Sequence, residues 1–203
     1  AVSDEHNYSF ATEVERIEQC LTQLEVTEPF HLVGHSCGGA IALKMAVHSP
    51  EKIASLTMYE PVAFHLLEQL NEHAVKEFAE QLEQLSLADA AASFVNYWNG
   101  EGFFQTLPEP AQAQMTAGMT KVNLDFHGIF AERYQLNDLS AILCPVLLLK
   151  GAATTTQSKQ LSEAIAKALP KVEFNSIHAG HMGPISHGYL VEPVISEFLL
   201  KMR

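Results

Sequence analysis

A short glycine-rich segment holds a serine in the setting that an enzyme nucleophile requires. Residues 34–38 read Gly-His-Ser-Cys-Gly, so Ser36 lies at the centre of a Gly-x-Ser-x-Gly pattern. An apolar run typical of a buried strand precedes it at residues 30–33, and a stretch typical of a helix follows at residues 38–48. Such a turn exposes the serine side chain, and the helix N-terminus favours developing negative charge. The segment predicts that Ser36 attacks a carbonyl carbon; the alternative is an incidental serine in a glycine-rich turn.

The residues beside Ser36 have expected roles of their own. Positions 34 and 38 are expected to require a small residue, here Gly34 and Gly38, because the strand and helix backbones crowd together at the turn. A pattern centred on Cys37 would place His35 where a glycine is required, so Cys37 is not the expected nucleophile. The backbone N–H of Cys37 is expected to contribute to an oxyanion hole, and His35 is expected to pack against the turn.

A nucleophilic serine needs a base, and histidine suits that work at neutral pH. Three of the ten histidines, His178, His181 and His187, follow the last expected strand. Of these, His181 follows a glycine in a loop of sequence Ala-Gly-His-Met-Gly. We expect His181 to be the base, and we interpret His178 and His187 as surface or loop histidines.

Strands and helices alternate along the chain outside one long segment. Apolar runs predict strands at residues 30–33, 53–59, 146–149 and 171–177. Helical periodicity and capping signals, with Ser9 as an N-cap, predict helices at residues 9–25, 38–48, 158–168 and 189–201. This alternation predicts an α/β fold with a mostly parallel sheet. The segment from about residue 62 to residue 140 is helical, and we interpret it as an excursion within a single domain of residues 1–203.

The composition is that of an acidic globular protein. Lys and Arg number 12 against 24 Asp and Glu, a net charge of −12 with histidine neutral, which argues against nucleic acid and membrane surfaces as partners. Three widely spaced cysteines predict reduced thiols, and the chain has neither a membrane-length apolar run nor a secretion signal at its start. We therefore expect a cytoplasmic protein that acts on a small molecule. No dinucleotide, Walker or metal-spaced motif is present, which predicts no cofactor and no metal.

The order of these features resembles the α/β-hydrolase superfamily, in particular its small bacterial esterase-like members. The resemblance extends over essentially the whole chain and is strongest at the Ser36 turn, at Tyr59-Glu60-Pro61 and at residues 180–184, Gly-His-Met-Gly-Pro. It implies that residues 62–140 form a helical cap, that His181 is the base, and that the triad needs an acid.

The expected acid position carries no carboxylate. The resemblance places an Asp shortly after Gly151, where residues 151–158 read Gly-Ala-Ala-Thr-Thr-Thr-Gln-Ser. Some relatives carry the acid at the end of the strand that follows the Ser36 helix, which is Glu60 in this sequence. We expect Glu60 to complete the triad; the alternative is that Glu60-Pro61 only anchors the cap.

The resemblance also implies about four strands before the Ser36 turn, whereas one helix precedes it in this sequence. The strand at residues 30–33 should then lie at a sheet edge, covered by a partner segment, a separate chain or a second copy. A loop among those strands donates the second oxyanion N–H in the family. We therefore expect the N-terminal strands to be missing and the chain to be inactive by itself.

Aromatic residues in the expected cap give the remaining hint about substrate. They could line an apolar pocket over Ser36, or they could form the core of the cap itself: Phe64, Phe94, Tyr97, Trp98, Phe103, Phe104, Phe126 and Phe130. The leading hypothesis is a serine hydrolase that cleaves an ester or similar carbonyl bond of a small apolar substrate through an acyl-enzyme. Two alternatives stay open: a non-catalytic binding protein with this fold, and cofactor-free C–C hydrolysis or perhydrolysis.

Overall fold

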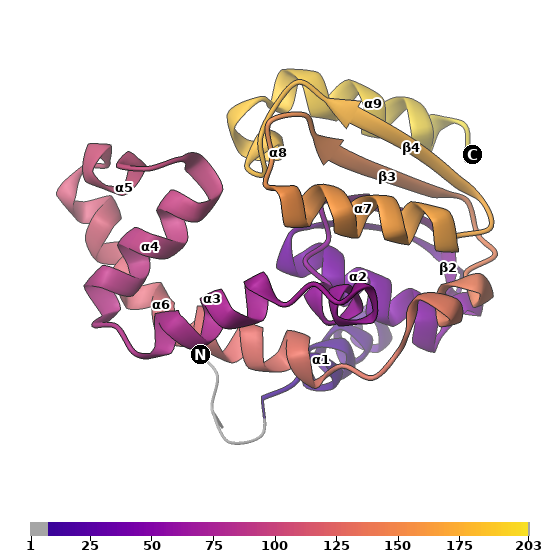
Figure 1. Cartoon of the computed structure of the whole chain (residues 1–203). Helices are drawn as coiled ribbons and strands as arrows, with labels where there is room; N and C mark the ends of the chain where they lie inside the picture. The colour runs from indigo at the N-terminus through magenta and orange to yellow at the C-terminus, as the bar shows by residue number, and fades with distance from the viewer. Residues whose placement is uncertain (1–7, 203) are drawn as a thin grey trace.

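Four parallel strands form one sheet in the order in which they occur along the chain. The computed structural model describes residues 8–202, and Figure 1 shows the arrangement of the elements. The strands are β1 (Phe30–His35), β2 (Ile53–Tyr59), β3 (Val146–Gly151) and β4 (Val172–Ile177). Each pairs in parallel with its neighbour, so their carboxyl ends meet at one edge. The predicted α/β fold with a mostly parallel sheet is confirmed.

Helices cover both faces of the sheet. Helices α2 (Cys37–His48) and α7 (Thr156–Ala168) bury one set of alternating strand residues, which includes Leu56, Met58 and Leu148. Helix α9 (Gly188–Leu200) covers the opposite set on the other face, which includes Leu147 and Leu149. The period of two along each strand therefore decides which helix each side chain meets. Two short helices, η2 (Pro50–Lys52) and α8 (Gly183–Ser186), precede β2 and α9.

The first helix begins at the predicted cap but ends earlier than expected. Helix α1 spans Phe10–Gln23, and the Ser9 hydroxyl accepts a hydrogen bond from the Thr12 backbone N–H at 3.3 Å. Leu24, part of the apolar repeat in the sequence, is 73% exposed. The helix stops before Leu24, so the 3.6-residue pattern no longer holds that side chain against the core.

The segment between β2 and β3 is helical. It contains η3 (Phe64–Leu70), α3 (Ala74–Glu83), α4 (Leu87–Asn99), α5 (Phe103–Thr106), α6 (Glu109–Ala131) and η4 (Leu136–Ala141). Helices α4 and α5 project as a lobe beside the sheet, with α6 running back towards α1 (Figure 1). An ion pair of 2.6 Å between Lys44 on α2 and Glu132 at the end of α6 fixes that return.

Strand β1 is an edge of the sheet and is more exposed than its apolar sequence predicts. His31 and Val33 point to the face that α9 covers farther along the sheet, and Val33 is 52% exposed. The prediction of a buried strand is therefore wrong for this face, because no described helix packs over it. Among residues 8–202, no strand pairs with the free side of β1.

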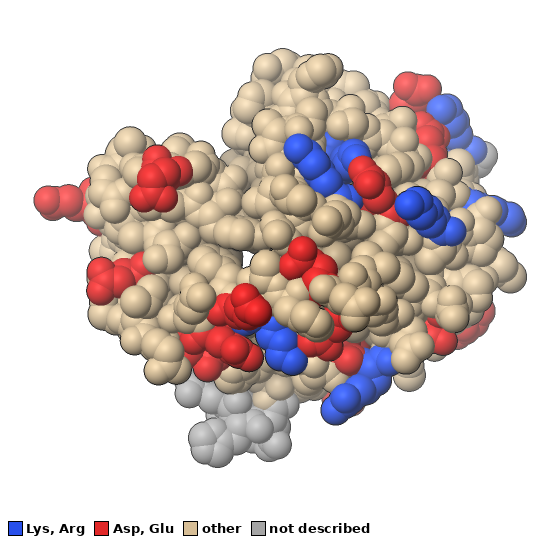
Figure 2. Space-filling model, in the orientation of Figure 1, with Lys and Arg blue, Asp and Glu red and all other residues tan. Residues whose placement is uncertain are grey.

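Charges of both signs are scattered over the face shown in Figure 2. Acidic side chains mark the lobe of α3–α5, and several basic ones lie over and around α7. None of the described helices combines the length and the apolar composition needed to cross a membrane.

Candidate active site

Ser36 occupies a strained turn between β1 and α2. Its φ of 55° lies in the left-handed region, which is rare for residues with a side chain. A Cβ on Gly34 would lie 2.5 Å from the carbonyl oxygen of Gly38, so the backbones at the turn approach too closely for any other residue. The expected need for glycine at position 38 is wrong, because a Cβ there meets nothing within 4 Å. The second close approach is made by Gly39, whose Cβ would lie 3.0 Å from the Cα of Pro61.

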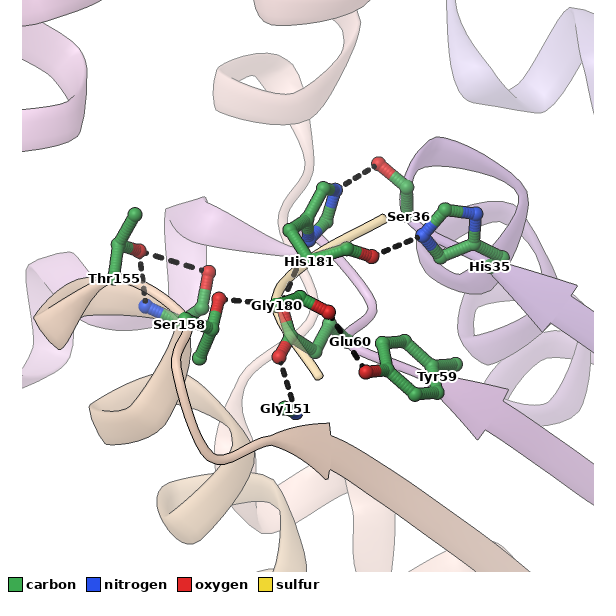
Figure 3. A network of polar contacts seen from close by, with 10 residues as sticks. His35, Ser36, Tyr59, Glu60, Gly151, Thr155, Ser158, Gly180 and His181 are labelled. Carbon is green, nitrogen blue, oxygen red and sulfur yellow. Dashed lines mark hydrogen bonds and ion pairs between the residues drawn. The ribbon is translucent and has the colours of Figure 1, made fainter. Parts of the chain in front are cut away.

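Three predicted site residues meet in one chain of hydrogen bonds (Figure 3). The Ser36 Oγ lies 2.9 Å from His181 Nε2, and His181 Nδ1 lies 2.7 Å from a carboxylate oxygen of Glu60. Ser36 follows β1, Glu60 follows β2, and His181 lies in the loop after β4. Parallel pairing brings these strand ends to the same edge of the sheet, which is where ligands bind in open α/β sheets.

Glu60 is held by the loop that lacks a carboxylate of its own. Its side chain is 1% exposed and accepts hydrogen bonds from the Gly151 backbone N–H at 2.6 Å and from the Thr154 hydroxyl at 2.7 Å. Glu60 itself has a φ of 44°. A buried carboxylate requires such partners, and hydrogen bonds from N–H and O–H groups stabilise its charged form. Glu163, another acid near this strand, lies on the surface in an ion pair with Lys150.

The histidine loop is tied to the sheet on both sides of His181. The Tyr59 hydroxyl donates to the Gly180 carbonyl at 2.8 Å, and His35 Nε2 donates to the His181 carbonyl at 2.8 Å. His35 therefore anchors the loop in addition to packing at the turn. Burial lowers the pKa of His35, and the nearby His181 lowers it further. A Cβ on Gly183 would lie 2.3 Å from the Tyr59 hydroxyl oxygen, so α8, which follows this loop, must begin with glycine.

The other two histidines near this loop lie apart from the hydrogen-bond chain. His178 is exposed. His187 Nδ1 shares a 2.8 Å hydrogen bond with the Ser186 hydroxyl on α8. The structure therefore brings His181, rather than either neighbour, to Ser36.

Cys37 opens α2 directly after Ser36. Burial raises the pKa of its thiol to about 12, and the negative charge of Asp125 on α6 contributes to the rise. The thiol is therefore protonated at neutral pH, which agrees with Cys37 not acting as a nucleophile. Its backbone N–H lies at the helix N-terminus, where an oxyanion would be stabilised.

A charged cluster beside the site was missed in the sequence. Asp125 accepts hydrogen bonds from the Tyr8 hydroxyl, at 2.6 Å, and from Lys121 one turn earlier on α6. Lys121 also donates to the Tyr8 hydroxyl at 2.9 Å. The spacing of Lys121 and Asp125 indicates a pair on one helix face, but nothing in the sequence places that face beside Ser36.

A small apolar cavity lies directly over Ser36. It measures about 60 Å³ and is lined by Ser36, Cys37, Val62, Phe64, Phe94, Trp98, Val122, Asp125, Phe126 and Ile129. Four of the eight aromatic residues singled out in the sequence thus line it. Phe104 is buried within the helical segment, Phe103 is 39% exposed, and Tyr97 and Phe130 stack on other aromatic rings. Both interpretations of the aromatic residues therefore hold, each for part of the set.

Comparison with known proteins agrees with the fold. The family model described as the alpha/beta hydrolase fold matches residues 2–99. A Bacillus subtilis (strain 168) protein whose assigned name is 2-succinyl-6-hydroxy-2,4-cyclohexadiene-1-carboxylate synthase is 24% identical over 204 residues, which cover 95% of this chain and 73% of that protein. The chain has the α/β-hydrolase fold, and the matched family model and the curated relative support its place in the α/β-hydrolase superfamily. The predicted superfamily is thereby confirmed.

Solved structures share the fold of this α/β-hydrolase at low identity. A hydrolase from Oleispira antarctica superposes with a TM-score of 0.75 at 17% identity, over 98% of this chain and 77% of that one. An esterase from Exiguobacterium antarcticum gives a TM-score of 0.72 at 17% identity, over 98% of this chain and 75% of that one. At such identities the likeness shows the fold alone.

One further contact in this α/β-hydrolase was not foreseen. The indole of Trp98 on α4 stacks on the imidazole of His181, with ring centroids 3.7 Å apart and an interplanar angle of 21°. Trp98 was noted in the sequence only as one of several aromatic residues. Its position 83 residues before His181 in the sequence gave no sign of contact.

Proposed function

We propose that this α/β-hydrolase cleaves an ester or similar carbonyl bond of a small apolar substrate through an acyl-enzyme. The observation that carries the proposal is the pair of hydrogen bonds that join Ser36, His181 and Glu60, at 2.9 Å and 2.7 Å. A hydroxyl, an imidazole and a buried carboxylate in this order form the arrangement that activates a serine in acyl transfer.

Each residue of the hydrogen-bonded series Ser36, His181 and Glu60 has a defined task in the proposed reaction. His181 Nε2 accepts the Ser36 proton while Ser36 Oγ bonds to the carbonyl carbon, and the carbonyl oxygen becomes negative. The Cys37 backbone N–H stabilises that oxygen. The imidazolium then gives its proton to the leaving alcohol as the bond to the alcohol breaks, which leaves Ser36 acylated. His181 then takes a proton from a water molecule while the water oxygen bonds to the acyl carbon. The bond from that carbon to Ser36 Oγ breaks, Oγ takes the proton back from the imidazolium, and the carboxylic acid is released.

Glu60 is proposed to orient His181 and to stabilise its charged form. Its carboxylate accepts a hydrogen bond from the Nδ1–H of His181, which leaves Nε2 free to take the Ser36 proton. Its bonds from Gly151 and Thr154 hold the carboxylate in place. These bonds support the proposal that Glu60 replaces the acid absent from residues 151–158.

The cavity over Ser36 supports a small acyl group as the part bound next to the nucleophile. Its volume of about 60 Å³ and mostly apolar lining favour a short acyl chain over a long or charged one. Asp125 is the charged residue in the lining, and its bonds to Tyr8 and Lys121 satisfy it.

A fluorophosphonate probe tests the proposed nucleophile. The probe phosphonylates an activated serine, so the wild type should be labelled and Ser36→Ala should not. Ser186→Ala, which removes an exposed serine on α8, is the matched control and should be labelled as the wild type is. Labelling that persists in Ser36→Ala would contradict the proposal. Because the expected N-terminal strands would donate the second oxyanion N–H, the probe is also applied to the protein that carries those strands; absence of labelling in that folded protein favours the alternative, a non-catalytic binding protein.

A further inference from the structure

The imidazole of His181 is covered on one face by a single aromatic ring. Trp98 lies over it with a centroid separation of 3.7 Å, and His181 is 2% exposed. Trp98 lines both the cavity over Ser36 and a groove between the end of α4 and the loops after β3 and β4. The indole therefore separates His181 from that groove.

Other rings hold Trp98 in this position. Phe64 stacks on it at 6.3 Å, Phe94 meets it edge to face at 6.4 Å, and Tyr97 does so at 4.8 Å. Three rings from two elements thus limit the rotation of the indole. The indole in turn limits the tilt of the imidazole beneath it.

The form of the stack indicates which charge state of His181 it favours. Two neutral aromatic rings prefer an offset or edge-to-face arrangement over a centred face-to-face one, because both faces are negative. A cation above an aromatic face is attracted to it, and tryptophan gives the strongest such attraction. A centred, nearly parallel stack at 3.7 Å suits an imidazolium better than an imidazole.

The other polar groups around His181 lie at its edges. Glu60 binds Nδ1, and Ser36 binds Nε2. The ring of His35 lies 5.1 Å away, at an angle of 42°. Glu60 favours positive charge on His181, whereas a protonated His35 would oppose it.

We propose that Trp98 is a positioning residue for His181, which holds the ring in line with Ser36 and Glu60 and stabilises its protonated form by a cation–π contact. The inference rests on the proposed function, in which His181 becomes an imidazolium as Ser36 attacks. Because that charge develops during the reaction step, a contact that strengthens with it raises kcat and not only substrate binding.

The test uses the fact that Trp98 is the one tryptophan of the sequence. Growth with mono-, di- and trifluorinated tryptophan weakens the π face stepwise and nearly preserves its shape. Fluorescence of each protein is followed against pH, because an imidazolium in contact with an indole quenches it. We expect the midpoint of the transition to move to lower pH with each added fluorine, by about 0.5 to 1 pH unit in total. His181→Gln should abolish the transition and so assign it.

In the same fluorinated proteins, the acid limb of the pH profile of kcat/KM should also move to lower pH, and kcat should fall several-fold. Both are measured with a short-chain p-nitrophenyl ester. Trp98→Phe should give a smaller shift than Trp98→Leu. If the leucine variant does not fold, the fluorinated series carries the test. Phe126→Leu is the control. Phe126 lines the same cavity, but its ring contacts Phe94 and not His181, so the variant should change KM and leave the midpoint of the fluorescence transition in place.

A midpoint that stays within about 0.1 pH unit across the fluorinated series would overturn the proposal. The fluorescence titration needs no turnover, so its result is separate from that of the probe labelling. A protein that carries the expected N-terminal strands and titrates as expected but is not labelled would refute the proposed hydrolase function and retain the Trp98 contact. The reverse result would retain the hydrolase and remove the role of Trp98.

Discussion

The carboxylate of Glu60 accepts a hydrogen bond from the backbone N–H of Gly151, 2.6 Å away. Gly151 ends β3 and begins the loop in which a catalytic acid was expected from the resemblance. The loop thus supplies donors to an acid that is carried by the neighbouring strand. Moving the carboxylate from one strand end to the next keeps it within reach of His181, because both ends lie at the same edge of the sheet.

Replacing Glu60 with Gln should reduce turnover far more than it reduces stability. The amide keeps the shape of the side chain but does not stabilise an imidazolium, and the corresponding change in a serine protease costs about 10⁴-fold in kcat. We expect a loss of about 10² to 10⁴-fold in the rate of ester hydrolysis, with thermal unfolding measured in parallel. Glu163→Gln, on the surface, serves as the control and should be as active as the wild type. Near-normal turnover in Glu60→Gln would remove Glu60 from the triad.

Gly34→Ala should be much less stable than Gly38→Ala, although both change a glycine of the same motif. A Cβ at Gly34 lies 2.5 Å from backbone, which cannot move aside, whereas a Cβ at Gly38 lies in open space within α2. We expect Gly34→Ala to destabilise the fold by about 3 kcal/mol or more and to lower Tm by about 10 °C. Gly38→Ala should be neutral or stabilising by up to about 1 kcal/mol, because alanine favours helix. Equal Tm values for the two variants would contradict the crowding at Gly34.

The sequence predicts the parts of this fold that depend on local pattern. Strand and helix periodicity located all four strands, and the glycine spacing located Ser36. Exposure was predicted less well, since whether Val33 is buried depends on what packs over β1 and not on its own neighbours in sequence.

The site residues that belong to a sequence motif were predictable, and those that reach the site through tertiary packing were not. Ser36 follows from local sequence, His181 follows from local sequence and from the resemblance, and Glu60 follows from an acid position that the resemblance offers once the usual one is empty. Trp98 and Asp125 lie beside the site because α4 and α6 fold back over it. Many weak tertiary contacts determine how α4 and α6 fold back, and no local pattern in the sequence encodes those contacts.

Buried His65 should make the protein less stable in mild acid. Its ring is 6% exposed and lies edge-on to Tyr134; burial lowers its pKa to about 4, and the Tyr134 backbone opposes that shift only in part. The unfolded chain takes up this proton near pH 6.5 and the folded chain only near pH 4, so stability falls as the pH drops between these values. We expect His65 to lower the free energy of unfolding by about 2 kcal/mol between pH 7 and pH 5.

Urea unfolding at the two pH values measures this dependence. His65→Leu should remove that part of it, because an apolar side chain has no proton to gain. Exposed His178→Gln should retain the pH dependence of the wild type. The same slope in wild type and His65→Leu would show that other groups cause it.

We propose that the edge of β1 with which no strand of residues 8–202 pairs mediates association with a second copy of this chain. An unpaired apolar strand offers N–H and C=O groups to a second strand, and Val33 is 52% exposed on the uncovered face. Light scattering across a range of concentrations should show the wild type associating as concentration rises. Val33→Lys should shift the protein towards the monomer, because a charge on an edge strand opposes pairing. Val26→Lys, at a position 41% exposed outside the sheet, should associate as the wild type does; equal masses for the two lysine variants would exclude β1 as the interface.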